Sequence, residues 1–454
     1  MKKRKVLFCA MSVLLAAAML LSACSNTSAS KNSLSSKASS QSSTPKKEIV
    51  LNYPTYRTGE NVGAKFFLPS VARFNAKYAG QYKVVVQEVV QNSYDDKIKQ
   101  LAQVNKLPTL MDGMHDTTWL KNYIIKNKLS YDLTDWLNQN PDVKNLCLKE
   151  SLAYCTIDGR IPIMPNIISS PSTTYYNTSM YKPSKTIRDM SPDEFLASLG
   201  DTTKVAFMTG ENAWTTQLLY SALIADQPGG ADILLQHTDK KVTDFNNSIF
   251  INATAELQKF LQKTASSNTI GAAYADADNT MLSKKAAVIF NGPWMFADFG
   301  TSSKDKWSNG FDGSTIMCDA YPGNVAIANN AAFGGYWIAN NASAEQKEAA
   351  LAFLKFVSSP SEVEQEILIA GGYAPNLKYS DDFKTQAASN KLLTEYTDAF
   401  NSDTKYVPGF DDVTYPSVAQ PGFPNLLPNL INNKITPEQF CAQLTKLSQQ
   451  AAQQ

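Results

Sequence analysis

Tryptophan and aspartate residues at the ends of strand-like runs are the first side chains here that could do chemistry. Trp294 follows an apolar run and the turn residues Gly292 and Pro293, so its ring can be presented to a cleft. Asp116 follows the strand-like residues 107–111. An indole covers apolar surface of a ligand and a carboxylate accepts hydrogen bonds. The pattern favours noncovalent binding, although a tryptophan there also fits a core and an aspartate there also fits a solvated loop.

Further candidates stand at the end of the first strand-like run, residues 49–53. Tyr53 and Arg57 lie where α/β proteins often place their ligands, beyond the carboxyl ends of the strands. Trp214 and Trp337 are additional aromatic candidates for the binding site, and for Trp337 packing inside the protein is the alternative.

Catalytic signatures are absent from the sequence. It contains no GxSxG, HExxH or glycine-rich phosphate loop, and only two histidines, His115 and His237. A zinc site therefore has few ligands to use, and residues 276–279 lack the glycine and distal glutamate of a calcium-binding EF-hand loop. We expect no cofactor, no bound metal and no enzymatic activity. A glycosidase, which needs two carboxylates across a cleft, is kept as an alternative.

Alternating strand-like and helix-like segments predict an α/β protein. Apolar residues at helical spacing and β-branched runs define the segments. The predicted strands are 49–53, 82–90 and 107–111, and the predicted helices are 64–78, 94–105, 119–128, 344–357 and 361–368. Ser343 or Asn341 could cap the helix over 344–357.

The N-terminus has the pattern of an export signal. Basic residues at positions 2–5 precede an apolar run of about 15 residues, which is too short to span a bilayer comfortably. The run ends in Leu21-Ser22-Ala23-Cys24, which resembles the bacterial lipobox. The resemblance implies cleavage after residue 23, lipidation of Cys24 and anchoring to the outer face of the cytoplasmic membrane. Residues 24–47 are rich in Ser, Thr and Lys and predict a flexible linker.

Charge and size limit the function of the exported part. Without residues 2–5 the chain keeps 38 basic against 41 acidic residues, so no nucleic-acid partner is expected. The roughly 400 residues after the linker suit two lobes rather than one core. Cys147, Cys155, Cys318 and Cys441 could form disulfides or remain buried thiols, and their spacing does not decide between the two.

Six blocks, in order, carry a resemblance to a known family. The blocks are residues 74–86, 94–110, 157–177, 283–294, 334–375 and 427–440. In this order they resemble the extracellular solute-binding proteins of carbohydrate ABC importers, the group that includes maltose-binding protein. Thr109 departs from the usual aspartate of that family, and Ser283 or Lys284 replaces a usual glycine. Each block alone is weak, whereas six in order over about 400 residues are specific.

The resemblance implies two discontinuous lobes joined by hinge strands, with the ligand between them. We expect residues 49–165 and 338–375 in one lobe, and residues 166–336 and 376–454 in the other. It also implies that Trp294 stacks on a sugar and that Asp116 binds its hydroxyl groups. Asn166 falls where some relatives carry a glutamate, and Tyr373 is a further candidate contact.

The family also implies the partners. We expect a monomer that binds an extracellular oligosaccharide, docks on the permease subunits of an ABC importer and is held to the bilayer through Cys24. A ligand-sensing accessory protein with the same fold is the alternative.

Overall fold

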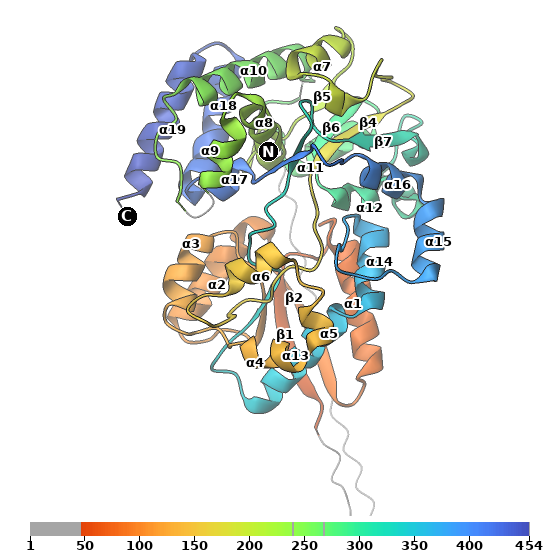
Figure 1. Cartoon of the computed structure of the whole chain (residues 1–454), viewed down its shortest axis with the longest axis vertical. Coiled ribbons are helices and arrows are strands. Elements are labelled where there is room, and N and C mark those ends of the chain that lie inside the picture. Colours follow the sequence, from red (N-terminus) through yellow and green to blue (C-terminus); the bar gives the residue numbers. More distant parts are fainter. Residues whose placement is uncertain (1–46, 238–239, 267, 454) are drawn as a thin grey trace, which may run out of the picture. The chain divides into compact units, whose positions relative to one another are not determined.

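The computed structural model describes residues 47–237, 240–266 and 268–453 (Figure 1). The predicted signal peptide, Cys24 and nearly all of the predicted linker lie outside these residues. Within them, no helix has the length and apolar character needed to cross a membrane. The described part forms one compact unit whose hydrophobic core is divided into separate clusters.

We use the name first lobe for the part built on the clusters around β1, β2, β3 and β9. Strands β1 (Ile49–Thr55) and β2 (Tyr82–Glu88) pair in parallel, and β3 (Leu110–Asp112) pairs antiparallel with β9 (Tyr336–Ile338). The helices of this lobe are α1 (Ala64–Lys77), α2 (Tyr94–Gln103), α3 (Thr117–Trp119), α4 (Thr134–Gln139), α5 (Pro141–Lys144), α6 (Lys149–Cys155) and α13 (Ala344–Val357).

Amphipathic helices explain how this lobe closes over its strands. Phe67, Val71 and Phe74 recur at helical spacing on α1, and all three are buried against the strands. α13 is capped by Ser343, whose hydroxyl accepts a hydrogen bond from the Gln346 backbone N–H in a capping box. Both helices are therefore specified by local sequence.

We use the name second lobe for the part built on a four-stranded sheet in the order β5-β6-β4-β7 and a smaller pair, β8 with β10. The strands are β4 (Thr173–Asn177), β5 (Val205–Ala206), β6 (Val288–Asn291), β7 (Ile316–Asp319), β8 (Val325–Ile327) and β10 (Lys405–Val407). The helices are α7 (Pro192–Ser198), α8 (Trp214–Asp226), α9 (Gly230–Gln236), α10 (Ser248–Thr264), α11 (Tyr274–Leu282), α12 (Phe296–Phe299), α15 (Asp381–Ser389), α16 (Lys391–Asp398), α17 (Phe410–Val413), α18 (Phe423–Ile431) and α19 (Pro437–Ala451).

Three chain segments that are distant in sequence run together between the two sets of strands. Pro165 forms an isolated bridge with Phe333, and Ser169 forms one with Tyr373. The backbone N–H of Ser169 donates to the Tyr373 carbonyl over 2.8 Å, and the Tyr373 N–H donates back over 2.9 Å. These segments lie close to the expected boundaries between the lobes, at residues 165–166, 336–338 and 375–376. The exact lobe boundaries stay a prediction.

Helix α14 (Pro360–Ala370) belongs to neither set of clusters alone. It contacts α1 and α13 of the first lobe and also α12 of the second. Its apolar residues Val363 and Ile367 pack in a second-lobe cluster, although the predicted boundary places this helix in the first lobe. The helix thus connects the two lobes by packing.

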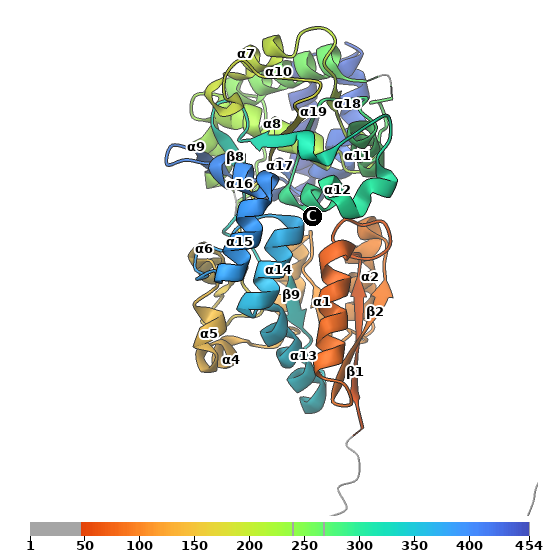
Figure 2. The ribbon, with the colours of Figure 1, turned by 90° about the vertical axis from the view of Figure 1, so that its right-hand side faces the viewer.

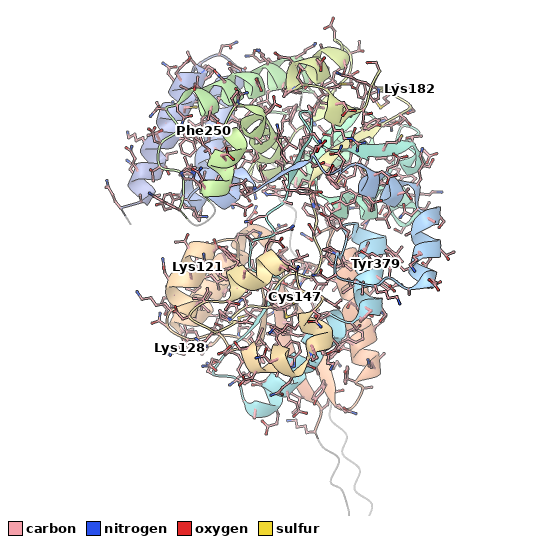
Figure 3. The ribbon with its side chains drawn as sticks, viewed as in Figure 1. Lys121, Lys128, Cys147, Lys182, Phe250 and Tyr379 are labelled. Carbon is pink, nitrogen blue, oxygen red and sulfur yellow. The ribbon has the colours of Figure 1, made fainter. Side chains whose placement is uncertain are left out.

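The four described cysteines are free and buried (Figure 3 labels Cys147). Burial raises the pKa of Cys147 to about 12 and the pKa of Cys155 to about 11. These thiols are therefore neutral and unpaired in the structure, as in the alternative of small buried side chains.

Candidate binding site

Trp294 lies directly after β6, on the short 3-10 turn Pro293–Met295. Its indole lies across Gly292, where a Cβ atom would overlap the ring, so only glycine fits there. The indole Nε1 donates to Asn291 Oδ1 over 3.1 Å, and the same oxygen accepts the Gly292 N–H over 2.8 Å. The end of β6 therefore fixes a partly exposed indole in one orientation.

Trp214, the first residue of α8, lies beside Trp294. The two ring centroids are 5.3 Å apart and the planes are inclined by 36°. The Trp214 Nε1 donates to Asp411 Oδ2 over 3.1 Å, which joins α8 to α17. Both rings are half-buried. Together they form an aromatic face with a carboxyl group at one end, and the buried Asn291 amide holds the Trp294 ring from inside the protein.

Asp411 has an unusual protonation equilibrium. Burial and the neighbouring Asp412 charge raise the pKa of Asp411 to about 7, although its own backbone N–H, His115 and Trp214 act in the opposite direction. A carboxyl with this pKa changes its charge near neutral pH. It can donate a hydrogen bond when protonated and accept two or more when ionised.

His115 of the first lobe lies close enough to Asp411 of the second lobe for each to affect the pKa of the other. The His115 side chain is about half exposed, and its Nδ1 lies 3.7 Å from Asp95 Oδ1. Loss of water around the imidazole lowers the pKa of His115, but its ion pair with Asp95, together with the charge of Asp411, raises the pKa overall. The Tyr56 ring lies 5.8 Å from the imidazole. Groups from both lobes thus contribute to one electrostatic environment.

Asp116 is held by the first lobe itself. Its Oδ1 accepts the Trp119 N–H over 3.0 Å and caps α3. Its Oδ2 accepts from Lys99 Nζ over 2.7 Å. Both oxygens already have partners, so a ligand would share or replace them. The predicted role of Asp116 in ligand binding stays a prediction.

Tyr53 and Arg57 belong to an internal network. The Tyr53 hydroxyl donates to Asp112 Oδ1 over 2.5 Å, and the Arg57 guanidinium forms an ion pair with the same carboxylate. Arg57 also donates to the Tyr336 hydroxyl over 3.2 Å and stacks on Phe67. Tyr53 is fully buried. These contacts connect the end of β1 to β3 and β9, and favour a structural role for the pair over the predicted ligand contact.

Trp337 is also fully buried, at 0 % exposure. Its Nε1 donates to the Asp112 carbonyl over 2.9 Å, across the β3–β9 pair. The position favours the packing alternative for Trp337, since no face of its ring is open to a ligand.

Asn166 and Tyr373 lie in the segments that run between the lobes. The Asn166 N–H donates to Ser151 Oγ over 2.8 Å, and its side-chain amide donates to the Phe333 carbonyl over 3.4 Å. Tyr373 is half-buried and is paired through its backbone with Ser169. Their predicted contacts with a ligand stay predictions.

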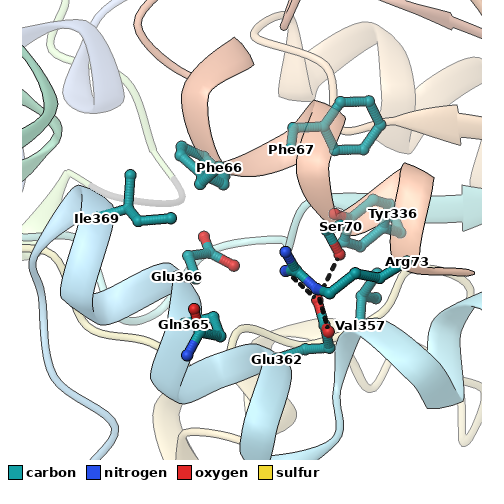
Figure 4. A pocket seen from close by; sticks show the side chains of 10 residues that line it. All are labelled: Phe66, Phe67, Ser70, Arg73, Tyr336, Val357, Glu362, Gln365, Glu366 and Ile369. Carbon is teal, nitrogen blue, oxygen red and sulfur yellow. Dashed lines mark hydrogen bonds and ion pairs between the residues drawn. The ribbon is translucent and has the colours of Figure 1, made fainter. Parts of the chain in front are cut away.

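A narrow cavity lies between α1 and α14, away from the two tryptophans (Figure 4). Its volume is about 10 Å³, enough for roughly one water molecule. Arg73 closes one side through a two-pronged ion pair with Glu362, with both distances 2.7 Å. The lining residues are Phe66, Phe67, Ser70, Arg73, Tyr336, Val357, Glu362, Gln365, Glu366 and Ile369. The cavity is too small for an organic ligand.

Comparison of sequences identifies a family. The family described as "Bacterial extracellular solute-binding protein" matches residues 70–400. No curated protein matches the chain significantly.

Comparison of structures finds many two-lobed binding proteins with low sequence identity. A chitin oligosaccharide binding protein has a TM-score of 0.70 and 18 % identity, over 90 % of this chain and 100 % of the other. A Streptococcus pneumoniae solute-binding protein in complex with the blood group A-trisaccharide has a TM-score of 0.67 and 19 % identity, over 87 % and 98 %. An ABC transporter solute-binding protein from Thermotoga lettingae bound with α-D-tagatose has a TM-score of 0.66 and 16 % identity, over 90 % and 99 %. The expected two-lobed α/β fold is confirmed.

Proposed function

Because the chain belongs to the bacterial extracellular solute-binding proteins, we propose that it captures an oligosaccharide between its lobes and delivers it to the permease of an ABC importer. The observation that carries the proposal is the Trp214–Trp294 face, which has the Asp411 carboxyl group at its edge. The carbohydrates named for the neighbouring structures support the same ligand class.

The chemistry of this face suits a sugar ring. A pyranose has apolar C–H faces that an indole covers, and a rim of hydroxyl groups that carboxylate and amide groups bind. The Trp214 Nε1 bond to Asp411 keeps a carboxyl beside the rings. An oligosaccharide offers successive rings to the two indoles, which lie 5.3 Å apart between centroids. Trp294 and Trp214 are therefore the proposed stacking residues.

The two lobes supply the mechanism. A ligand that contacts both lobes stabilises the arrangement in which they lie together, because only that arrangement makes every contact. His115 and Asp116 stand on the β3–α3 loop of the first lobe, whereas Asp411 and both tryptophans stand on the second. The liganded protein is then the form that the permease recognises.

The family and the N-terminal sequence support the proposed location. The family is extracellular, and we propose that lipidation of Cys24 anchors the protein on the outer face of the cytoplasmic membrane. Two acyl chains anchor a protein stably, whereas one chain does so only marginally. The Ser-rich segment 24–47 would let a monomer reach the permease.

Titration calorimetry with a panel of oligosaccharides tests the proposal. We expect saturable binding of at least one intact oligosaccharide, with chromatography of the recovered ligand showing no cleavage. Cleavage of the sugar would favour the glycosidase alternative. Failure of every sugar in the panel, together with binding of peptides or amino acids, would contradict the carbohydrate assignment but not the family.

A further inference from the structure

Lys65 of the first lobe forms bonds with the second lobe. It is the second residue of α1, and its Nζ donates to Asp298 Oδ1 over 3.0 Å and to the Ala297 carbonyl over 3.1 Å. The same ammonium donates to Ser303 Oγ. Ala297 and Asp298 belong to α12, and Ser303 to the 3-10 segment after it. Figure 2 shows the start of α1 next to α12.

The acceptor is a buried carboxylate. Asp298 is 1 % exposed, whereas the Lys65 side chain keeps 27 % of its surface exposed. An ammonium can meet such a carboxylate only by leaving much of its own water, so the three acceptors around Nζ replace that hydration. The contact is therefore a partly buried site with three acceptors for one lysine, rather than an ion pair on an open surface.

A second lysine, Lys306, contacts the same carboxylate from within the second lobe. Lys306 Nζ lies 3.3 Å from the same Asp298 Oδ1 and 3.9 Å from Glu60, which is almost fully exposed. Asp278 of α11 is 6 % exposed and its Oδ1 has no hydrogen-bond partner. When the lobes separate, Asp298 keeps Lys306 and loses Lys65. Lys65 is thus the ammonium that bonds the buried Asp298 across the lobes, whereas the contact of Lys306 with the first lobe is a 3.9 Å pair with the exposed Glu60.

We infer that Lys65 is an inter-lobe latch: it favours the arrangement in which α1 lies against α12 before any solute is bound. The inference depends on the two-lobed fold and on these contacts, and does not require the solute to be a carbohydrate. When the lobes separate, Asp298 loses Lys65, one of its two cations. When the lobes associate, Lys65 regains all three of its bonds. A latch of this kind raises the fraction of ligand-free molecules in which the two lobes are associated.

Electron-spin distance measurements on the ligand-free protein test the latch. Spin labels at Ala72→Cys on α1 and Thr301→Cys after α12 report the separation of the two elements, since both positions are exposed and the four described native cysteines are buried. We expect Lys65→Met to raise the ratio of separated to associated lobes about fivefold to tenfold. Lys306→Met removes the other cation at Asp298 and a 3.9 Å pair with Glu60 of the first lobe. We expect a much smaller change, because Glu60 is almost fully exposed and exposed ion pairs contribute little.

The double variant separates a latch from a general loss of stability. In an Asp298→Asn background, Lys65→Met should produce little further change in the distance distribution, because the ion pair that the two residues share is already lost. Thermal unfolding of each variant checks that it is folded. If Lys65→Met does not fold, Lys65→Gln, which keeps a hydrogen-bond donor but not the charge, replaces it. An unchanged distance distribution, or equal shifts for the Lys65 and Lys306 variants, would overturn the inference.

Discussion

The indole Nε1 of Trp214 donates a hydrogen bond to Oδ2 of Asp411 over 3.1 Å, although 197 residues separate the two in the chain. The bond has two consequences. It fixes the ring of Trp214 against Trp294, and it keeps a carboxyl with a pKa of about 7 at the edge of the aromatic face. The ring that is proposed to stack on the sugar therefore lies beside a carboxyl group that changes its charge near neutral pH.

Replacing Trp294 by alanine should weaken oligosaccharide binding strongly. The substitution removes one of the two stacking rings, and buried tryptophans at binding surfaces commonly contribute roughly 2 kcal/mol or more. We therefore expect about a thirtyfold or larger rise in Kd by titration calorimetry. The fold should persist, because the ring is only half-buried. An unchanged Kd would remove Trp294 from the site.

Trp136→Ala is the matched control. Trp136 is also half-buried, but it lies on α4 and packs on a first-lobe cluster. We expect this variant to lose some thermal stability and to keep its affinity for the sugar. Equal losses of affinity in both variants would show that the Trp294 effect is an indirect effect of destabilisation.

Much of the fold could be predicted because its signals are local. The helix expected over 344–357 is α13 with the same limits, and of the two candidate caps, Ser343 and Asn341, Ser343 is the one that caps it. The helix expected over 119–128 instead begins at Thr117 as a short α-helix and continues as a π-helical turn from Leu120 to Ile125. Apolar spacing indicates that such a segment is helical, but does not distinguish the types of turn.

The site was less predictable because its contacts are distant in sequence. Trp294 could be proposed from the adjacent Gly292 and Pro293, a local turn. Asp411 was missed, since no motif surrounds it and its partner is far along the chain. Arg57 shows the opposite error, a residue that was proposed for the site but is used elsewhere. It stands at a typical ligand position, but Asp112, 55 residues later, forms an internal ion pair with it.

The affinity for sugar should depend on pH through Asp411. Its raised pKa of about 7 means that the carboxyl is mainly protonated at pH 6 and mainly ionised at pH 8. Charge-assisted hydrogen bonds from hydroxyl groups to a carboxylate are stronger than neutral ones. We expect binding to become about threefold to tenfold tighter from pH 6 to pH 8, and Asp411→Asn to remove most of this dependence.

His115→Gln provides the control for that pH dependence. His115 has a pKa above its usual value and loses its charge in an overlapping range. The variant should keep the increase in affinity with pH, since Asp411 still titrates. If the increase disappears with His115→Gln and persists with Asp411→Asn, the histidine rather than the aspartate is responsible.

The stability of the fold should depend on pH through Asp278. Burial and the charge of Asp298 raise its pKa to about 7, although Lys306 and Lys65 oppose this. The folded protein then holds this proton more tightly than the unfolded chain does. As the pH rises from about 4 to 7, ionisation of Asp278 lowers the free energy of unfolding, and above about pH 7 this destabilisation is complete. Asp278→Asn should therefore raise the Tm by roughly 2 °C or more at pH 8, and little at pH 4.

Asp305→Asn is a matched control for this measurement. Asp305 is exposed on the 3-10 segment that also carries Lys306. Removing an exposed carboxylate changes the net charge equally but should leave the dependence of Tm on pH unchanged. A gain in Tm that is the same at both pH values for Asp278→Asn would show that its charge is not the cause.

Cys24→Ala should release the protein from the membrane without changing its affinity for sugar. Cys24 lies outside the residues that the structure describes, and the prediction rests on the Leu21-Ser22-Ala23-Cys24 pattern. The cysteine thiol is the only group there that could carry the proposed lipid, so the alanine variant should appear in the culture medium or in the soluble fraction. Ser25→Ala, one residue later, should remain with the membrane.

Calorimetry on the released variant should give the wild-type Kd, because residues 24–47 precede the first strand. Retention of Cys24→Ala on membranes that are washed with high salt would instead favour an uncleaved signal segment as the anchor.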